Sequence, residues 1–146
     1  MKISTKGRYA LRMMMDIAEH QDQGLVALKD IAARQDISKK YMEQIALQLT
    51  QAGMLQAVRG HQGGYRLVQP PASYTVGAIL QVTEGSLAPV ACLDHSPNAC
   101  PRCDFCPTLP VWQGLERVIT EYLNGVTLAD VMAQDKEVQQ TQEPQA

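Results

Sequence analysis

Ile37-Ser38-Lys39-Lys40-Tyr41-Met42-Glu43-Gln44-Ile45 is the stretch that decides the fold of this chain. Ser38 stands where a helix would begin, because its hydroxyl can accept a hydrogen bond from a backbone N–H group that lacks a partner within the helix. The helical pattern continues to about Ala52, and Gly53 follows at a position that commonly ends a helix. The pattern predicts an amphipathic helix. Its apolar face is Met42, Ile45, Ala46 and Leu49, and its polar face is Lys39, Lys40, Glu43, Gln44 and Gln51.

Two helices are predicted before this stretch and a hairpin after it. Residues 5–20 carry apolar side chains at helical spacing, and a short helix is expected over residues 28–34, followed by a three-residue turn. Two strand-like runs at 55–58 and 65–68 flank a glycine-rich basic loop, which indicates a β-hairpin. This order of elements is that of a winged helix-turn-helix, and Pro70-Pro71 end it.

The rest of the chain is predicted to be helical around one long loop. A helix is expected at 75–84, a loop with all four cysteines at 85–110, and a long helix at 111–123. Thr127-Leu128-Ala129-Asp130 is a capping-box pattern that begins a last short helix. The expected fold class is mainly α with a small β-hairpin wing. Its parts are a winged helix-turn-helix domain at 1–70, a linking helix and cysteine loop at 71–110, a long helix and a short terminal helix at 111–134, and a disordered Gln-rich tail at 135–146.

The composition is that of one compact domain whose charge is unevenly divided. The chain has 146 residues, 45% of them apolar and 19% charged, with a formal net charge of −2. Residues 1–69 hold ten Lys and Arg against six Asp and Glu, a net charge of +4, and residues 70–146 hold three against nine, a net charge of −6. Such asymmetry suggests that the first half contacts a polyanion, although ordinary scatter in charge is the alternative.

The sequence lacks the marks of two classes of protein. It has no apolar run of 18 or more residues, so no membrane-spanning helix is predicted. No apolar run of about 7–15 residues follows the basic N-terminus, so no signal peptide is predicted and a cytoplasmic location is expected. It has no glycine-rich phosphate loop, nucleophile–base pair or pair of carboxylates, and its three histidines are scattered. We therefore expect neither membrane association nor catalysis.

The expected recognition helix and wing carry side chains suited to DNA. In a helix-turn-helix, the second helix enters the major groove, about 12 Å wide, with its N-terminal side chains at the base edges. Lysines contact phosphates, Gln44 can bond adenine and Glu43 can accept from cytosine N4. Hairpin glycines let the backbone approach the duplex, and Arg59 can enter the minor groove or pair with a phosphate. The alternative is a solvated polar face beside a tight turn. The candidate DNA-binding residues are Lys6, Ser38, Lys39, Lys40, Tyr41, Glu43, Gln44, Arg59, Gly63 and Gly64.

The four cysteines, Cys92, Cys100, Cys103 and Cys106, lie within 15 residues, which favours ligands or redox groups over structural disulfides in a reducing compartment. Cys100-x2-Cys103-x2-Cys106-Pro107 resembles the three-cysteine part of a ferredoxin-type iron–sulfur run, with Cys92 as a candidate fourth ligand. Zinc also takes four thiolates, but usually from two separated pairs. Free or oxidation-prone thiols are the third interpretation, and spacing alone leaves all three open.

Several motifs resemble the IscR/NsrR/RirA family of bacterial winged-helix repressors that sense iron–sulfur clusters. The likeness covers about residues 1–133. Its motifs are the opening Ser4-Thr5-Lys6-Gly7-Arg8-Tyr9-Ala10, the segment from Ile37 to Ile45, the wing from Val58 to Tyr65, Val76-Gly77-Ala78-Ile79, the leading Cys92, and Trp112 followed by Leu115.

The resemblance implies a homodimer that reads a pseudo-palindromic site in double-stranded DNA. The dimerisation helix would be the long helix within residues 111–134. It also implies that Glu43 discriminates between sequences, because a carboxylate at a DNA surface repels phosphate unless it finds a base donor. The implied dimer interface is Val111, Trp112, Leu115, Val118, Ile119 and Tyr122.

The resemblance further implies that Cys92, Cys100 and Cys106 hold a two-iron or four-iron cluster. The fourth ligand stays open, because Leu109 stands where IscR-like proteins have a ligand histidine and Arg8 where NsrR-like proteins have a ligand aspartate. The interval from Cys92 to Cys100 is also longer than in IscR, and Cys103 is the candidate by spacing.

The predicted function is a DNA-binding transcription regulator, expected to be a repressor, whose affinity for DNA the cluster controls. The alternative is a cluster-free winged-helix regulator that responds to thiol oxidation or to a protein partner through the same DNA-binding half.

Overall fold

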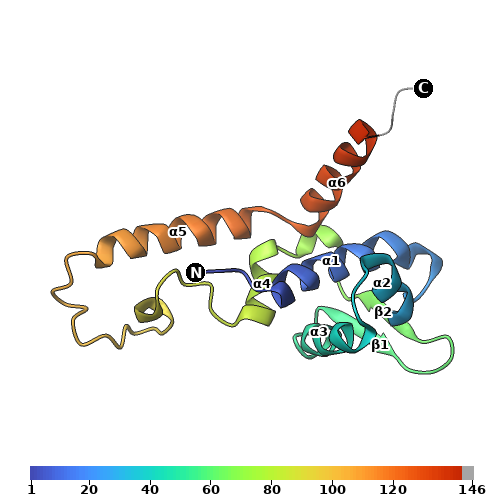
Figure 1. Cartoon of the computed structure of the whole chain (residues 1–146), viewed down its shortest axis with the longest axis horizontal. Helices are drawn as coiled ribbons and strands as arrows, with labels where there is room; N and C mark the ends of the chain where they lie inside the picture. Colours follow the sequence, from blue (N-terminus) through green and yellow to red (C-terminus); the bar gives the residue numbers. More distant parts are fainter. Residues whose placement is uncertain (143–146) are drawn as a thin grey trace.

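A helical body with a hairpin wing forms one end of the molecule, and a long helical arm forms the other (Figure 1). This computed structural model describes residues 1–142. The body follows the order expected of a winged helix-turn-helix. Its elements are α1 (Thr5–His20), α2 (Leu28–Gln35), α3 (Lys39–Gln51), β1 (Leu55–Val58), β2 (Gly64–Leu67) and α4 (Val76–Glu84), with short 3-10 turns at Gln21–Gln23 and Pro71–Ser73.

Side-chain caps and left-handed residues set the ends of the body's helices. Ser4 Oγ accepts from the backbone N–H of Gly7 at 3.2 Å, at the start of α1. Asp36 ends α2 with a φ of 53°, a left-handed conformation that short polar side chains tolerate. Gly53, with a φ of 75°, follows α3 as its sequence position predicts. These local stops create the tight turns between successive elements.

The body is built around α1, whose apolar face is fully buried. Met13, Met14 and Ile17 of α1 have no exposed surface, and the same holds for Met42, Ile45 and Leu49 of α3. The apolar face predicted for α3 therefore packs inward, and its polar face stays outside. The hairpin continues this core through Leu55 and Leu67, which are paired in the antiparallel register of β1 and β2.

An ion pair to the buried Asp16 fixes α2 against α1. The Asp16 side chain is 1% exposed and accepts from Arg34 Nη2 at 2.6 Å and from Arg34 Nε at 3.0 Å. Gln35 Nε2 donates to Asp16 Oδ2 at 2.9 Å. The hydrogen bond to Asp16 raises the pKa of Arg34 above its ordinary value. Both Asp16 oxygens are engaged, and this holds the short helix in place because an unpaired carboxylate at this buried position would be costly.

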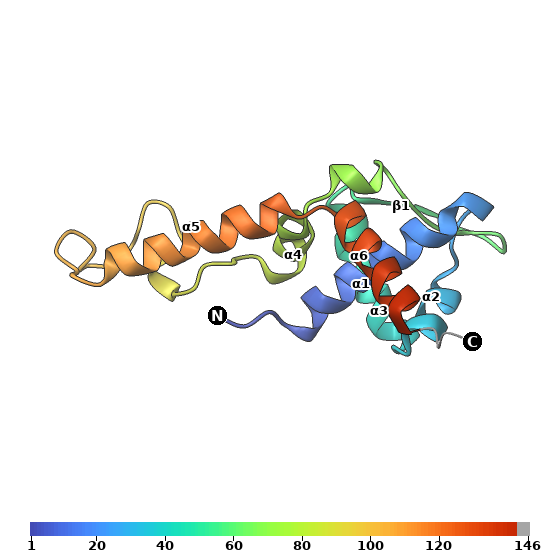
Figure 2. The ribbon, with the colours of Figure 1, turned by 90° about the horizontal axis from the view of Figure 1, so that it is seen from above.

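The arm begins after α4 and returns along α5 (Leu109–Gly125), with the cysteine loop at its far end (Figures 1 and 2). A third 3-10 turn lies within that loop at Ala91–Leu93. The chain after α5 is held to the body by two backbone hydrogen bonds of 2.8 Å. One runs from the N–H of Val76 to the carbonyl of Val126, and the other from the N–H of Leu128 to the carbonyl of Tyr74. The body therefore fixes only one end of α5.

The last helix, α6 (Leu128–Gln142), is longer than the sequence pattern predicted. The expected capping box is formed: the N–H of Asp130 donates to Thr127 Oγ1 at 3.1 Å and the N–H of Thr127 donates to Asp130 Oδ2 at 2.9 Å. The prediction of a disordered tail from residue 135 was wrong for residues 135–142, because α6 continues through them. Residues 143–146 of that expected tail lie outside the described residues.

Candidate functional site: the nucleic-acid interface and the cysteine loop

The outward side of α3 is a polar surface that begins at its N-terminus. Ser38 Oγ accepts from the backbone N–H of Tyr41 at 3.2 Å, so the cap inferred from the sequence is formed. Lys39, Lys40, Glu43 and Gln44 are all exposed. The partial positive charge of the helix N-terminus adds to that of the two lysines.

Tyr41 is tied to α1 by aromatic contacts. Its ring meets the Tyr9 ring edge-on, with ring centroids 5.8 Å apart and planes at 82°. The Arg12 guanidinium lies 5.3 Å from the centroid of the Tyr9 ring and also donates to the side chain and the carbonyl of Gln35. Tyr41 therefore helps to fix the start of α3, whatever else its hydroxyl contacts.

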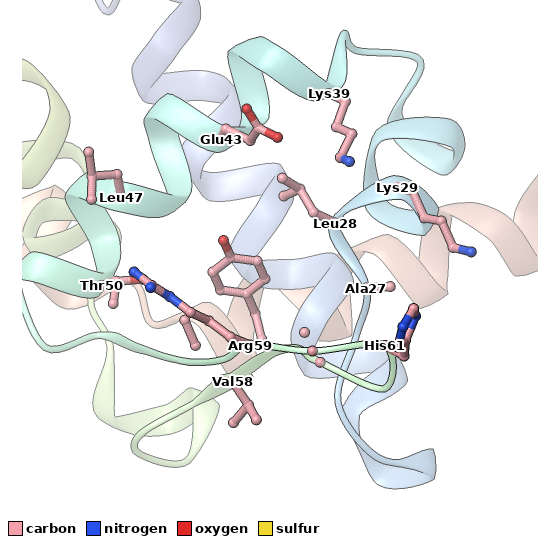
Figure 3. A pocket seen from close by; sticks show the side chains of 15 residues that line it. Ala27, Leu28, Lys29, Lys39, Glu43, Leu47, Thr50, Val58, Arg59 and His61 are labelled. Atoms are coloured by element: carbon pink, nitrogen blue, oxygen red, sulfur yellow. The ribbon is translucent and has the colours of Figure 1, made fainter.

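A groove with a volume of about 720 Å³ separates α3 from the wing, which consists of β1, β2 and their connecting loop (Figure 3). Glu43 and Leu47, on successive turns of α3, lie on one side of it, and Arg59 of the wing lies across from them. Lys39 at the start of α3, and Lys29 in the first turn of α2, also line the groove. Three basic side chains thus line the groove together with a single carboxylate.

The structure brings together only part of the predicted DNA-binding set. Lys39, Glu43, Arg59, Gly63 and Gly64 line the groove. Of the others, Ser38, Lys40 and Gln44 are exposed at α3 outside it, and Lys6 lies in the first turn of α1. The groove also contains residues that the sequence did not single out, namely Lys29, Leu47, Thr50 and His61. Their approach depends on how α2, α3 and the wing pack, which no local pattern reveals.

Two wing glycines have a structural reason of their own. A Cβ on Gly64 would stand 2.6 Å from the carbonyl oxygen of Val26, where β2 pairs with the segment before α2. A Cβ on Gly63 would collide with the carbonyl oxygen of Val58 across the hairpin. Close approach of the chain to itself therefore requires glycine at both positions, independently of any duplex.

The cysteine loop carries four partly exposed thiols, none of them in a disulfide. The Cys106 Sγ lies 3.4 Å from Thr108 Oγ1, and this hydrogen bond lowers the pKa of Cys106. Partial desolvation, followed by the neighbouring Asp104 carboxylate, raises the pKa of Cys103. Cys106, an expected cluster ligand, and Cys103, the candidate fourth ligand, therefore differ in how readily they form the thiolate that binds iron.

The donor set fits an iron–sulfur cluster in chemistry, since four thiol sulfurs occur on one loop. Within residues 1–142, however, the structure does not gather three or more His, Cys, Asp or Glu side chains into a group that could hold a metal ion. Any such group would form only after the loop changes its arrangement.

One side of α5 is an unpaired apolar stripe. Val111, Leu115, Val118 and Tyr122 recur every three or four residues and are between 43% and 69% exposed. The other two residues expected at a dimer interface, Trp112 and Ile119, are half-buried. None of the helices in residues 1–142 is long and apolar enough to span a membrane.

A winged helix-turn-helix body with a polar recognition helix beside a cationic groove is the architecture of DNA-binding regulators. A model of the Rrf2 family, described as "Iron-dependent Transcriptional regulator", matches residues 3–134. The chain belongs to the Rrf2 family of transcription regulators.

Named relatives agree with this membership. The chain is 39% identical to the HTH-type transcriptional regulator IscR of Aliivibrio salmonicida over 145 residues, which is 99% of this chain and 84% of that protein. It is also 39% identical to Protein rrf2 of Nitratidesulfovibrio vulgaris over 90% of this chain and 87% of that protein.

Solved structures share the fold. T. potens IscR superposes with a TM-score of 0.76 at 39% identity, covering all of this chain and 94% of that one. CymR, the global cysteine regulator of B. subtilis, superposes with a TM-score of 0.74 at 33% identity, covering 91% of this chain and 97% of that one.

Proposed function

We propose that this regulator binds double-stranded DNA with α3 in the major groove and the wing at the adjacent minor groove. The observation that carries the proposal is the groove between them, which Lys29, Lys39 and Arg59 line together with one carboxylate, Glu43. A sugar–phosphate strand separates a major from a minor groove and carries one negative charge per nucleotide. The cationic groove therefore fits one strand of a duplex.

The remaining candidates divide between positioning and sequence readout. Lys40 contacts phosphate, and the capped N-terminus of α3 at Ser38 adds backbone donors. Gln44 can bond adenine, and Glu43 accepts from an amino group of cytosine or adenine. Lys6, in the first turn of α1, is the weakest member of the set because it does not line the groove.

The experiment that tests DNA binding is selection from a random duplex library followed by titration at several salt concentrations. We expect a pseudo-palindromic consensus and an affinity that falls steeply as salt rises. Binding that is independent of salt and sequence would contradict the proposal.

We further propose that the chain is a homodimer joined through α5. The stripe of Val111, Leu115, Val118 and Tyr122 is apolar and exposed, and Trp112 and Ile119 flank it. A contiguous apolar face of this length is typical of a surface that pairs with another helix. Two copies joined there would present two winged bodies to the two half-sites of a palindrome.

Control of DNA affinity is proposed to reside in the cysteine loop, with Cys92, Cys100 and Cys106 as the ligands of an iron–sulfur cluster and Cys103 as the candidate fourth. When bound, a cluster supplies a thiolate-ligated redox centre whose potential depends on its surroundings. Control requires that the loop be arranged differently with and without the cluster. It also requires that the two arrangements give the protein different affinities for DNA. The loop can meet this requirement because none of residues 85–108 is buried.

A second candidate is direct response to thiol oxidation, without a cluster. Two observations favour it: all four thiols are partly exposed, and within the described residues they are not gathered around a common point. In this case DNA binding would respond to a disulfide-forming oxidant and would be indifferent to iron and sulfide.

Iron and sulfide analysis of protein purified without oxygen, together with visible absorption, separates the two candidates. We expect bound iron and sulfide, their loss in Cys106→Ala, and their retention in Cys103→Ala if the resemblance assigns the ligands correctly. Loss in both variants would make Cys103 the fourth ligand. Absence of iron and sulfide from the unmodified protein, combined with oxidant-sensitive DNA binding, would favour the thiol sensor.

A further inference from the structure

Leu47 is an exposed apolar side chain on the polar side of the recognition helix. It is 58% exposed, whereas the apolar residues that define the inner face of α3, such as Ile45, are fully buried. At about 100° per residue, Leu47 is turned roughly 200° from Ile45, so it faces away from the core. It is also absent from the partly buried hydrophobic residues that pack against that core. Burial within the described chain therefore does not explain a leucine here.

Its surroundings are those of the DNA-facing groove. Leu47 lines that groove, one helical turn after Glu43 and one turn before Thr50 (Figure 3). Arg59 of the wing lies across from the same stretch of helix. A leucine offers no hydrogen bond to a phosphate or to a polar base edge. What it can recognise in a major groove is an apolar group.

We infer that Leu47 is a specificity-determining residue that contacts the 5-methyl group of a thymine. That methyl is the only apolar group that the base pairs present in the major groove, and apolar side chains are its usual partners. The inference rests on the proposed binding of α3 in the major groove and names a readout within it.

The position of Glu43 narrows the expected sequence. Four residues of helix rise about 6 Å, which is roughly two steps of a DNA strand at about 3.4 Å each. Glu43 has only acceptor oxygens and needs an amino donor from cytosine or adenine. The expected half-site therefore contains such a base with a thymine within about two steps of it.

The test uses the full-length protein and its own selected duplex, in which each thymine is replaced in turn by deoxyuridine. This replacement removes one methyl group and leaves every base pair and hydrogen-bonding group unchanged. We expect one position per half-site at which it weakens binding by roughly fourfold, as for the loss of one buried methyl group. In Leu47→Ala, the thymine and deoxyuridine duplexes should bind equally at that position.

Val68→Ala is the matched control, because Val68 is 50% exposed but lies outside the groove. It should retain the full preference for thymine, and both variants should keep the melting temperature of the unmodified protein. A selected half-site without thymine would overturn the inference. So would a deoxyuridine effect that persists in Leu47→Ala, or an affinity loss in Leu47→Ala that is equal for both duplexes at every position. These results leave the proposed DNA binding intact, whereas failure to select any duplex overturns both.

Discussion

In the proposed complex with DNA, Glu43 and Arg59 have opposite effects on a phosphate group: Glu43 repels it and Arg59 attracts it. Glu43 is the single acid among the described residues that line it, so it repels phosphate unless a base amino group faces it. Arg59 lies across the groove from it, and in the proposed complex it would attract the DNA strand regardless of sequence. The proposed binding therefore assigns affinity and specificity to different side chains of the same groove.

Arg59→Ala should weaken DNA binding by about tenfold at physiological salt and lower the steepness of the salt dependence by about one for each subunit, because one phosphate contact is lost. Fluorescence titration at three or more salt concentrations measures both quantities. Arg66→Ala is the control, since Arg66 is an exposed arginine on β2 that bonds Gln56 and does not line the groove. If Arg59→Ala and Arg66→Ala had the same salt dependence, the wing would not be part of the DNA interface.

Glu19, near the end of α1, is expected to limit stability at neutral pH. Partial burial, and then repulsion from Asp135 of α6, raise its pKa. Because folding raises the pKa of Glu19, the folded chain loses stability as pH rises and this carboxyl ionises. At low pH, where Glu19 is protonated in both the folded and the unfolded chain, no stability is lost. Glu19→Gln should therefore raise the melting temperature at pH 7. The gain in free energy of unfolding should be less than about 1 kcal/mol, because the side chain is partly solvated.

Thermal unfolding at pH 7 and near pH 4, about the ordinary pKa of glutamate, checks this prediction. The gain should disappear at the lower pH. Glu121→Gln, at an exposed glutamate of α5, should behave like the unmodified chain at both values. A gain that is unchanged at low pH would assign the effect to something other than charge.

At the scale of elements, the crossing of α4 and α5 is the joint between body and arm. A Cβ on Gly77 would collide with the side-chain oxygen of Asn124 and stand 3.3 Å from the backbone carbon of Leu123. The two helices can be this close only because α4 has no side chain at the crossing. The joint therefore depends on one missing methyl group.

Gly77→Ala should destabilise the chain by about 1–3 kcal/mol, the usual cost of overpacking, although alanine is the better helix former. Denaturant unfolding measures the change. Adding Asn124→Ala should recover part of the loss, because it removes the side-chain atoms that the new methyl group meets. If Gly77→Ala were instead stabilised, the crossing of α4 and α5 would have space for a methyl group.

Helix order and the core face of α3 followed from the sequence because both depend on local periodicity and local stops. The length of α6 did not, since residues 135–142 are helical without an apolar repeat. The Asp16–Arg34 pair joins residues far apart in the sequence and was not foreseen. For the same reason Lys29, Leu47 and His61 were missed as groove residues: each has an ordinary local context, and only packing brings them together. The loop cysteines were easy to find, but their spacing says nothing of how the loop arranges them.

At the scale of the whole molecule, the wing and the cysteine loop lie at opposite ends, with α5 extending along the arm that carries the loop (Figures 1 and 2). The exposed stripe on α5 lies between these ends. Pairing two copies along it would set the separation of the two reading surfaces, so the proposed dimer and the proposed control of affinity depend on the same helix.

Val118→Glu should give a monomer, because it places a charge in the centre of the stripe. Its affinity for a palindromic duplex should fall by about a hundredfold or more as the gain from two linked contacts is lost. Light scattering gives the oligomeric state, and titration gives the affinity. Gln113→Glu, an exposed residue on the opposite side of α5, should change neither. If Val118→Glu were still a dimer, the dimer interface would lie elsewhere on the protein.

Burial has one further consequence, for how such a protein can diverge. None of residues 85–125 is buried, whereas the apolar face of α1 is fully enclosed. Replacements in the loop therefore alter no packing in the body, and changes in its length cost little because a longer surface loop is only slightly harder to close. A lineage can exchange one sensory chemistry for another at that end of the molecule while it inherits the DNA-reading end unchanged.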